Sequence, residues 1–134
     1  LQKSISLDLI PVTFGDVLIA NNGFYIHSGD LIVHDLCKLL TPKRVIFASN
    51  IDGIYQNPED DSSLIPIINN NKNNLKFSKL HYDVTGGIKT KINQSLKIAN
   101  LGIDVQITNG LNTKNLSKAL NGEHVGTLFV GDNV

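Results

Sequence analysis

The segment over residues 83–91, with the sequence DVTGGIKTK, brings two adjacent glycines and two lysines to the start of a region with helical periodicity. Because they lack side chains, Gly86 and Gly87 let backbone amides come close to a ligand. A helix that begins here adds free N–H groups and the positive end of its dipole. Lys91 adds a charge that the dipole disfavours unless an anion compensates it. These features suit a polyphosphate, although a glycine-capped loop with two solvated lysines is the alternative that the motif alone leaves open.

The elements that must position this segment alternate between strands and helices. Apolar runs and turn signals predict strands over residues 7–13, 17–19, 24–26, 44–49, 64–68, 103–108 and 126–130. Asn21-Asn22-Gly23 predicts a hairpin turn, and Pro66 predicts that residues 64–68 form an edge strand. Helices are predicted from Ser28 to about Leu40, from about Ile88 to Gly102, and around residues 116–120. The second helix carries its apolar residues on one face: Ile88, Ile92, Leu96 and Ala99.

This alternation predicts an α/β fold, a three-layer αβα sandwich with a mostly parallel sheet in which residues 44–49 form a central strand. Ligands bind such sheets beyond the carboxyl ends of the strands. Three polar motifs fall at those positions, namely Gly15-Asp16, Ser28-Gly29-Asp30 and Ser49-Asn50. We therefore expect them to share one edge of the sheet.

Composition and charge narrow the classes of function. The 134 residues carry no net charge at pH 7, so no overall field attracts nucleic acid or an anionic membrane. No apolar run has the length to cross a bilayer, and the first residues do not resemble a signal peptide, so we expect a cytoplasmic protein. Cys37 is the single cysteine and the four histidines are scattered, so we predict no metal-ligating residue. The lack of methionine suggests the C-terminal portion of a longer protein.

Five motifs, in order, resemble those of the amino acid kinase superfamily, and within it the isopentenyl phosphate kinases. They are PVTFGDV over residues 11–17, HSGD over 27–30, SNIDGIY over 49–55, DVTGG over 83–87 and GTLF over 126–129. The resemblance implies that residues 1–134 are the C-terminal, nucleotide-binding portion of an amino acid kinase-like domain whose N-terminal lobe is missing from this chain.

The resemblance also implies a reaction. It is the transfer of the γ-phosphoryl group of ATP to isopentenyl phosphate, giving isopentenyl diphosphate for isoprenoid biosynthesis, with Mg²⁺ accompanying ATP. Such transfer needs positioning and charge neutralisation more than covalent help. The implied partner is a small-molecule phosphate acceptor, with no nucleic acid or membrane, and the full-length protein is expected to be a homodimer. In the family, the N-terminal lobe supplies a glycine-rich loop, a second lysine and a histidine, so we expect this chain alone to be almost inactive.

By resemblance, Lys91 is catalytic and reaches the transferring phosphoryl group, while Asp30 holds catalytic lysines by ion pairing. The nucleotide-binding residues would be Ser49, Asn50, Asp52, Gly53, Tyr55, Gly86, Gly87 and Lys91. The residues beside the acceptor would be Gly15, Asp16, Ser28 and Gly29. Structural alternatives exist for several of them: Asp30 as a helix cap, Asp16 and Asp52-Gly53 as turn formers, Tyr55 as a packing residue and Lys89 as a solvated lysine.

The sequence departs from the family pattern at Asn50, where aspartate is usual, and at Ile88, which replaces methionine. Asn50 lacks the charge that a metal-linked network would use. Other acceptors in the family also remain open, namely uridylate, glutamate, acetylglutamate and fosfomycin. Two further possibilities are a nucleotide-binding module without catalysis and an interaction fragment with uncovered strand edges and low solubility.

Overall fold

The computed structural model describes residues 1–69 and 87–131. Its main sheet has four strands in the order β3-β7-β8-β6, with β3 (Arg44–Ser49), β6 (Ile67–Ile68), β7 (Asp104–Asn109) and β8 (Thr127–Phe129). Strands β3 and β7 are parallel, as are β6 and β8, whereas β7 and β8 are antiparallel. The sheet is therefore mixed and mostly parallel, which confirms the predicted α/β fold.

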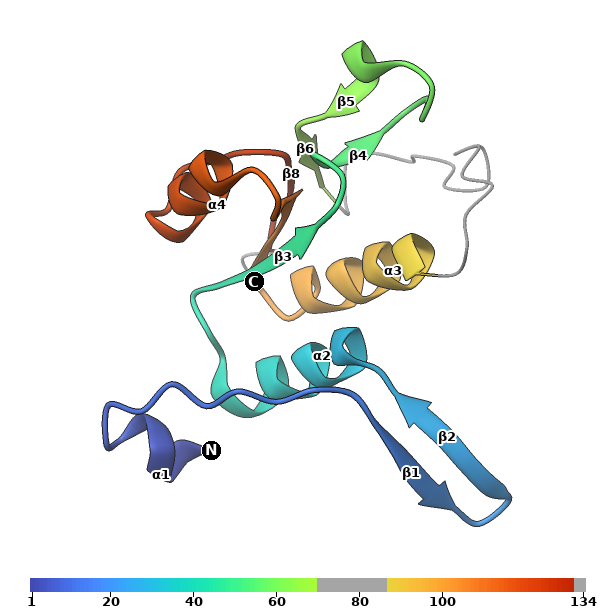
Figure 1. Ribbon diagram of the computed structural model, residues 1–134, viewed down its shortest axis with the longest axis vertical. Helices are drawn as coiled ribbons and strands as arrows, with labels where there is room; N and C mark the ends of the chain where they lie inside the picture. Colours follow the sequence, from blue (N-terminus) through green and yellow to red (C-terminus); the bar gives the residue numbers. More distant parts are fainter. Residues whose placement is uncertain (70–86, 132–134) are drawn as a thin grey trace.

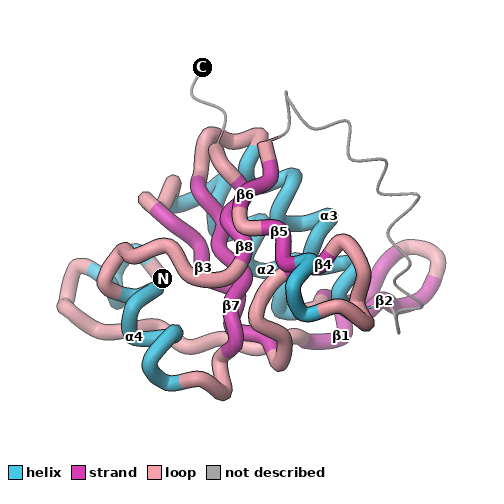
Figure 2. The backbone as a smooth tube through the Cα atoms, turned by 90° about the horizontal axis from the view of Figure 1, so that it is seen from above, coloured by secondary structure: helices cyan, strands magenta, loops and turns pink. Residues whose placement is uncertain are grey.

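Helices cover both faces of this sheet (Figures 1 and 2). Helix α3 (Gly87–Ala99) packs on β7 and β8 from one side, and α4 (Thr113–Leu120) packs on β3 and β7 from the other. Helix α2 (Gly29–Leu40) packs against α3 and runs in the same direction, so both helices begin at the same side of the molecule (Figure 1). Apolar residues of α3, β7 and β8 meet in the core, among them Ile92, Ile98, Ile107 and Phe129. The three predicted helices are confirmed.

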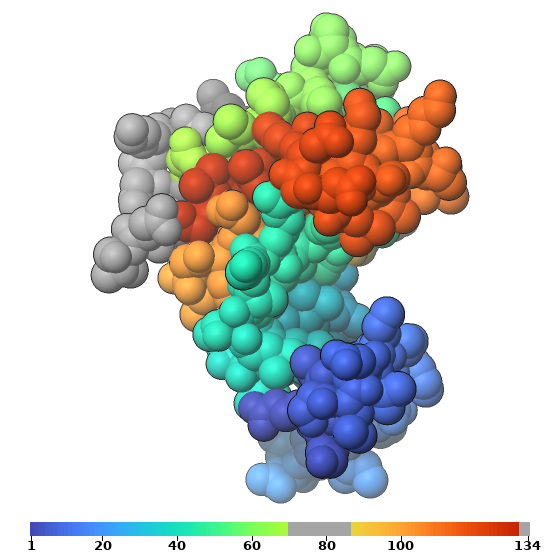
Figure 3. All heavy atoms as spheres, turned by 90° about the vertical axis from the view of Figure 1, so that its left-hand side faces the viewer, coloured from blue at the N-terminus to red at the C-terminus, as the bar shows by residue number. Residues whose placement is uncertain are grey.

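The predicted hairpin is also confirmed. Strand β1 (Asp16–Ala20) pairs antiparallel with β2 (Gly23–His27), and Gly23 has φ +127°, a conformation that side-chain-bearing residues rarely adopt. The hairpin projects from the N-terminal end of α2 (Figure 1), and the N-terminal residues, in blue, gather at the lower end of the molecule in Figure 3. Large apolar side chains on the hairpin are exposed, including Ile19 at 93% and Phe24 at 79%.

The prediction of a buried strand over residues 7–13 is wrong. A short helix, α1 (Gln2–Ile5), is followed by irregular chain up to β1, and Leu9, Ile10 and Val12 are exposed. An apolar run becomes a strand only where a neighbouring strand accepts and donates its ladder of hydrogen bonds. No strand within the described ranges pairs with this run.

Two strand predictions need adjustment. Residues 64–68 divide at Pro66, which has no N–H: β5 (Leu64–Ile65) pairs with β4 (Ile54–Tyr55) in a separate small sheet, and β6 joins the main sheet at its edge. A 3₁₀ turn over Asp61–Ser63 precedes β5. Strand β3, expected at the centre, lies at the other end of the described sheet. An apolar run shows that a strand can be buried, but its place in the sheet is set by the strands that pair with it, and among the described strands β3 pairs with β7 alone.

Candidate functional site

An ion pair joins the N-terminal ends of α2 and α3. The Lys91 ammonium, in the second turn of α3, donates to Oδ1 of Asp30 in the first turn of α2 at 2.7 Å. The two side chains are 18% and 20% exposed. The contact arises because the two helices lie side by side and run in the same direction. The Asp30 carboxylate is favourable at the start of α2 and also compensates the Lys91 charge that the dipole of α3 disfavours.

The Lys91 ammonium also lies over an aromatic ring. Its Nζ is 4.6 Å from the centroid of Phe47, a buried residue of β3. Since Phe47 stands two residues before Ser49, where β3 ends, the ammonium lies toward the carboxyl end of that strand. Sequence reasoning missed Phe47 because a phenylalanine in an apolar run carries no signal of its partner.

The four residues expected beside the acceptor come together at the base of the hairpin. Asp16 is the register partner of His27, and a Cβ added to Gly15 would lie 3.0 Å from the His27 carbonyl oxygen and 3.4 Å from the Gly29 nitrogen. Ser28 occupies the N-cap position of α2, yet its side chain makes no capping hydrogen bond. We call this group the acceptor corner (Gly15, Asp16, Ser28 and Gly29). Its last two residues directly precede Asp30 in the chain.

The segment over residues 49–55 runs from the last residue of β3 to the end of β4 and is tied to the end of β7. The Asn109 side-chain amide donates to Oδ1 of Asp52 at 2.9 Å, and the Gly110 amide donates to the Ser49 carbonyl at 2.7 Å. The hydroxyl of Ser49 reaches Oδ1 of Asn50 at 3.5 Å. Asn109 and Gly110 were not predicted as site residues, although an Asn-Gly pair at the carboxyl end of a parallel strand marks the same sheet edge.

The GT motif, Gly126-Thr127, contacts this segment by hydrogen bonding and close packing. The Thr127 hydroxyl accepts from the Ile54 amide at 2.7 Å and donates to the Ile65 carbonyl at 2.7 Å. A Cβ on Gly53 would lie 2.6 Å from the Thr127 Oγ1, and Gly126 has φ +78° with backbone oxygens close by. Gly53 is buried and Tyr55 half-buried in β4, so both have a packing role whatever else they do.

Residues 83–86 of the DVTGG motif lie outside the described residues, and the predicted site residue Gly86 is among them. Gly87 is the first residue of α3, and a Cβ added there would meet no atom of residues 1–69 or 87–131 within 4 Å. None of these residues therefore covers the backbone at Gly87.

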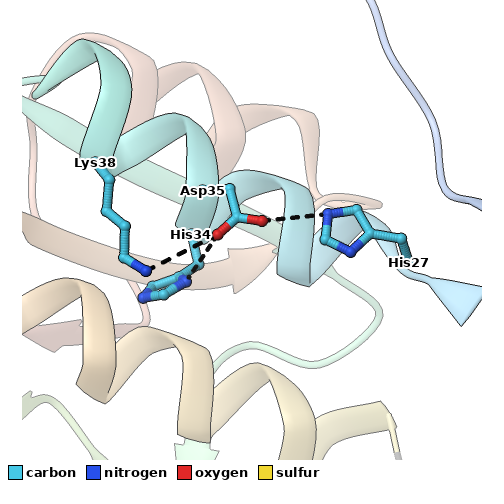
Figure 4. Close-up of polar contacts among 4 residues, drawn as sticks. All are labelled: His27, His34, Asp35 and Lys38. Carbon is cyan, nitrogen blue, oxygen red and sulfur yellow. Dashed lines mark ion pairs between the residues drawn. The ribbon is translucent and has the colours of Figure 1, made fainter. Parts of the chain in front are cut away.

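A second polar group that the sequence did not predict is drawn in Figure 4, and it includes His27, which directly precedes Ser28 of the acceptor corner. Asp35 of α2 contacts three cationic or titratable side chains: His27 Nε2 at 3.3 Å, His34 Nδ1 at 3.5 Å and Lys38 Nζ at 4.0 Å. The His27 contact links the end of β2 to α2. Across residues 1–69 and 87–131, no three His, Cys, Asp or Glu side chains are grouped to hold a metal ion.

No helix in the described part of the chain has both the length and the apolarity needed to cross a membrane.

Comparison with known proteins places this geometry in a family. Residues 1–109 match the model of the amino acid kinase family. Isopentenyl phosphate kinase from Arabidopsis thaliana is 32% identical, with 90% of this chain and 42% of that protein covered. The enzyme of the same name from Methanothermobacter thermautotrophicus is 34% identical, with 92% and 49% covered. Glutamate 5-kinase from Prochlorococcus marinus subsp. pastoris is 29% identical, with 96% and 38% covered.

Solved structures of isopentenyl phosphate kinases resemble this chain in fold. The product complex of T. acidophilum isopentenyl phosphate kinase superposes with a TM-score of 0.71 at 26% identity, covering 96% of this chain and 50% of that one. A further structure of isopentenyl phosphate kinase gives a TM-score of 0.73 at 27% identity, with 95% and 48% covered. The chain thus spans half or less of the length of these relatives. Since the family model covers most of its residues, this chain belongs to the amino acid kinase family.

Proposed function

We propose that this chain is the nucleotide-side portion of an ATP-dependent kinase that phosphorylates isopentenyl phosphate to isopentenyl diphosphate. The observation that carries the proposal is the Lys91–Asp30 pair at the shared starting side of α2 and α3. It supplies a held, partly accessible cation beside two helix N-termini, which is the environment that a transferring phosphoryl group requires. The likeness to isopentenyl phosphate kinases over most of the chain supports the choice of acceptor.

In this proposal Lys91 balances the charge that develops on the transferring phosphoryl group. Asp30 does not touch phosphate; it holds the ammonium by the 2.7 Å contact. The first amides of α3, which begins at Gly87, point along the helix axis toward the phosphates. The three features act on the same charge, so each is expected to matter more for turnover than for substrate affinity.

The acceptor corner would receive the phosphate of isopentenyl phosphate. The N-terminal amides of α2 and the Ser28 hydroxyl, which makes no cap, are suitable donors. The Asp16 carboxylate accepts from the Val17 amide at 2.7 Å, so it serves the turn in addition to any contact with substrate. This arrangement suits an anionic acceptor with a small headgroup.

On the nucleotide side, the segment over residues 49–55 would border ATP, with Asp52 held by Asn109. Mg²⁺ bound with ATP would neutralise phosphate charge. The residues present fit an ion that arrives on the nucleotide, since Mg²⁺ is commonly held by one or two carboxylates, water and phosphate oxygens. They do not fit a cage built by protein alone, because within the described ranges no three suitable side chains meet and position 50 is Asn.

A second candidate acceptor is glutamate, because a glutamate 5-kinase matches over 96% of the chain. The two candidates differ in the charged group that reaches the acceptor corner, a phosphate in one case and a carboxylate in the other.

The test uses the full-length protein with ATP and Mg²⁺. Isopentenyl phosphate, L-glutamate and uridylate are offered in parallel, and the phosphorylated products are identified by mass spectrometry. Lys91→Met is compared with Lys89→Met, which removes an exposed lysine from the same helix. We expect product from isopentenyl phosphate, a loss of roughly 100-fold or more in kcat for Lys91→Met, and wild-type rates for Lys89→Met.

If glutamate or uridylate gave product and isopentenyl phosphate did not, the proposed acceptor would be wrong, whereas the proposal of a kinase would stand. Equal rates for Lys91→Met and wild type would refute the role of the ion pair. Binding of an ATP analogue with no product from any acceptor would instead identify a nucleotide-binding module. We further propose that residues 1–134 alone give little turnover, which the same assay measures on the isolated chain.

A further inference from the structure

The contact between Lys91 and the ring of Phe47 goes beyond the roles given above. Phe47 is 6% exposed and belongs to the same core as Val45, Ile92 and Ile107. Its position on β3 is therefore fixed by packing on the sheet. The Lys91 ammonium, at 4.6 Å from the ring centroid, has a carboxylate on one side and an aromatic ring on another.

We propose that Phe47 is a positioning residue for Lys91, whose ring holds the ammonium group at the carboxyl end of β3 where a phosphate can reach it. The proposal rests on the kinase function proposed above. A ring in this position attracts a cation through its quadrupole and carries no net charge.

That difference in charge has a consequence for phosphate binding. Asp30 already neutralises Lys91, so a second carboxylate would leave the pair with a net negative charge that repels phosphate. The ring provides a second point of attachment and leaves the net charge of the pair at zero. A cation held from two directions also has fewer rotamers to lose when the phosphate arrives, and Lys side chains are among those with most to lose.

The competing explanation is that Phe47 only fills the core and that Lys91 lies over it by chance. A matched control separates the two, because Phe129 on β8 is fully buried in the same core. Phe129→Leu removes the same atoms from the same core as Phe47→Leu, whereas the ring that the Lys91 ammonium lies over is that of Phe47. Phe47→Met serves as a second variant, with about the volume of leucine in a longer, unbranched side chain that can adapt to the vacated space.

The direct measurement is NMR of the full-length protein with ¹³C-labelled lysine, with the Lys91 signal assigned by its loss in Lys91→Arg. The ring current of Phe47 should displace the Lys91 Hε resonances from those of solvated lysines. We expect this displacement to disappear in Phe47→Leu and Phe47→Met and to persist in Phe129→Leu. Undisplaced Lys91 resonances in the wild type, or a displacement that survives both Phe47 variants, would overturn the proposal, as would equal loss in Phe129→Leu.

Kinetics gives the functional half of the test. Loss of a cation–π contact should lower kcat about 2- to 30-fold in the Phe47 variants relative to Phe129→Leu, with KM for ATP nearly unchanged. Equal kcat values in the Phe47 variants and the control would refute the positioning role. The resonance displacement does not depend on turnover, so an inactive Lys91→Met with no effect of Phe47 refutes this inference alone. Absence of product from isopentenyl phosphate refutes the proposed function, and an unaffected Lys91→Met refutes the role of Lys91 in it. In both cases the NMR result still reports the contact.

Discussion

The Lys91–Asp30 ion pair should contribute measurably to the stability of the fold, and a double-mutant cycle can isolate that contribution. The changes are Asp30→Asn and Lys91→Met, singly and together, which remove each charge while keeping most of the side-chain volume. Fully exposed pairs couple by about 0.2–1 kcal/mol, and removal of one partner from a fully buried pair costs about 3–5 kcal/mol. Because these side chains are 18% and 20% exposed and 2.7 Å apart, we expect a coupling free energy of roughly 1–2.5 kcal/mol.

The assay is urea unfolding of the full-length protein at pH 7, repeated in about 1 M salt, where the Debye length shrinks to about 3 Å. The pair is only partly accessible, so at least half of its coupling should survive in salt. The matched control is Asp35→Asn with Lys38→Met, a pair 4.0 Å apart with side chains 56% and 55% exposed. That control should couple by less than about 0.5 kcal/mol and lose its coupling in salt.

A Lys91–Asp30 coupling no larger than that of the control would refute the reasoning. It would mean that the ammonium spends most of its time in solvent, and the proposed phosphate cradle would lose its support.

Three further predictions concern single residues. Gly126→Ala should lower the free energy of unfolding by more than about 2 kcal/mol, because φ is +78° and backbone oxygens crowd the position, whereas Gly87→Ala should change it by less than about 1 kcal/mol; urea unfolding of both variants checks this. Hydrogen bonds from the Ser62 hydroxyl and then the Ser62 amide lower the pKa of Asp60 below 3.8, so its stabilising effect should be complete above that pH and be lost as the pH falls below it. Thermal melts of Asp60→Asn should accordingly depend less on pH on the acid side, and an unchanged dependence would contradict this. Burial raises the pKa of the Cys37 thiol above 9.0, so the unfolded chain releases this proton first and stability should fall as the pH rises above about 9. Cys37→Ala should flatten that alkaline decline in unfolding experiments at pH 8 and pH 10.

Local patterns in the sequence predicted the helices and the hairpin correctly. The spacing of Ile88, Ile92, Leu96 and Ala99 places all four on one face, and that face is the one that packs on the core. The glycine at position 23 met a conformational need that the turn itself imposes. In each case the decisive interaction lies within a few residues of the signal.

Predictions that depended on distant partners were less successful. The apolar residues 7–13 have the composition of a strand, but composition does not reveal whether a neighbour is there to pair with. The same limit applies to β3, whose apolar run did not reveal that it lies at an end of the described sheet.

For the site, family resemblance nominated Asp30 and Lys91, which are 61 positions apart and meet only in the folded chain. It did not nominate Phe47 or Asn109. Their types are ordinary for a buried strand and for a turn, and only the packing of α3 on the sheet and the pairing of β3 with β7 give them their partners. The contacts of Phe47 and Asn109 depend on residues that are distant in the sequence, so the sequence alone did not predict them.

The hydroxyl of Thr127 has a consequence for how this molecule can vary. This one oxygen atom links the small β4–β5 sheet to the main sheet, because it hydrogen-bonds to Ile54 of β4 and to Ile65 of β5. The two strands are connected by residues 56–63, which lie at the end of the β4–β5 sheet away from Thr127. Insertions or deletions in this connection can change its length while Thr127 still holds the start of β4. The connection can therefore vary in sequence without moving Asp52 and Gly53.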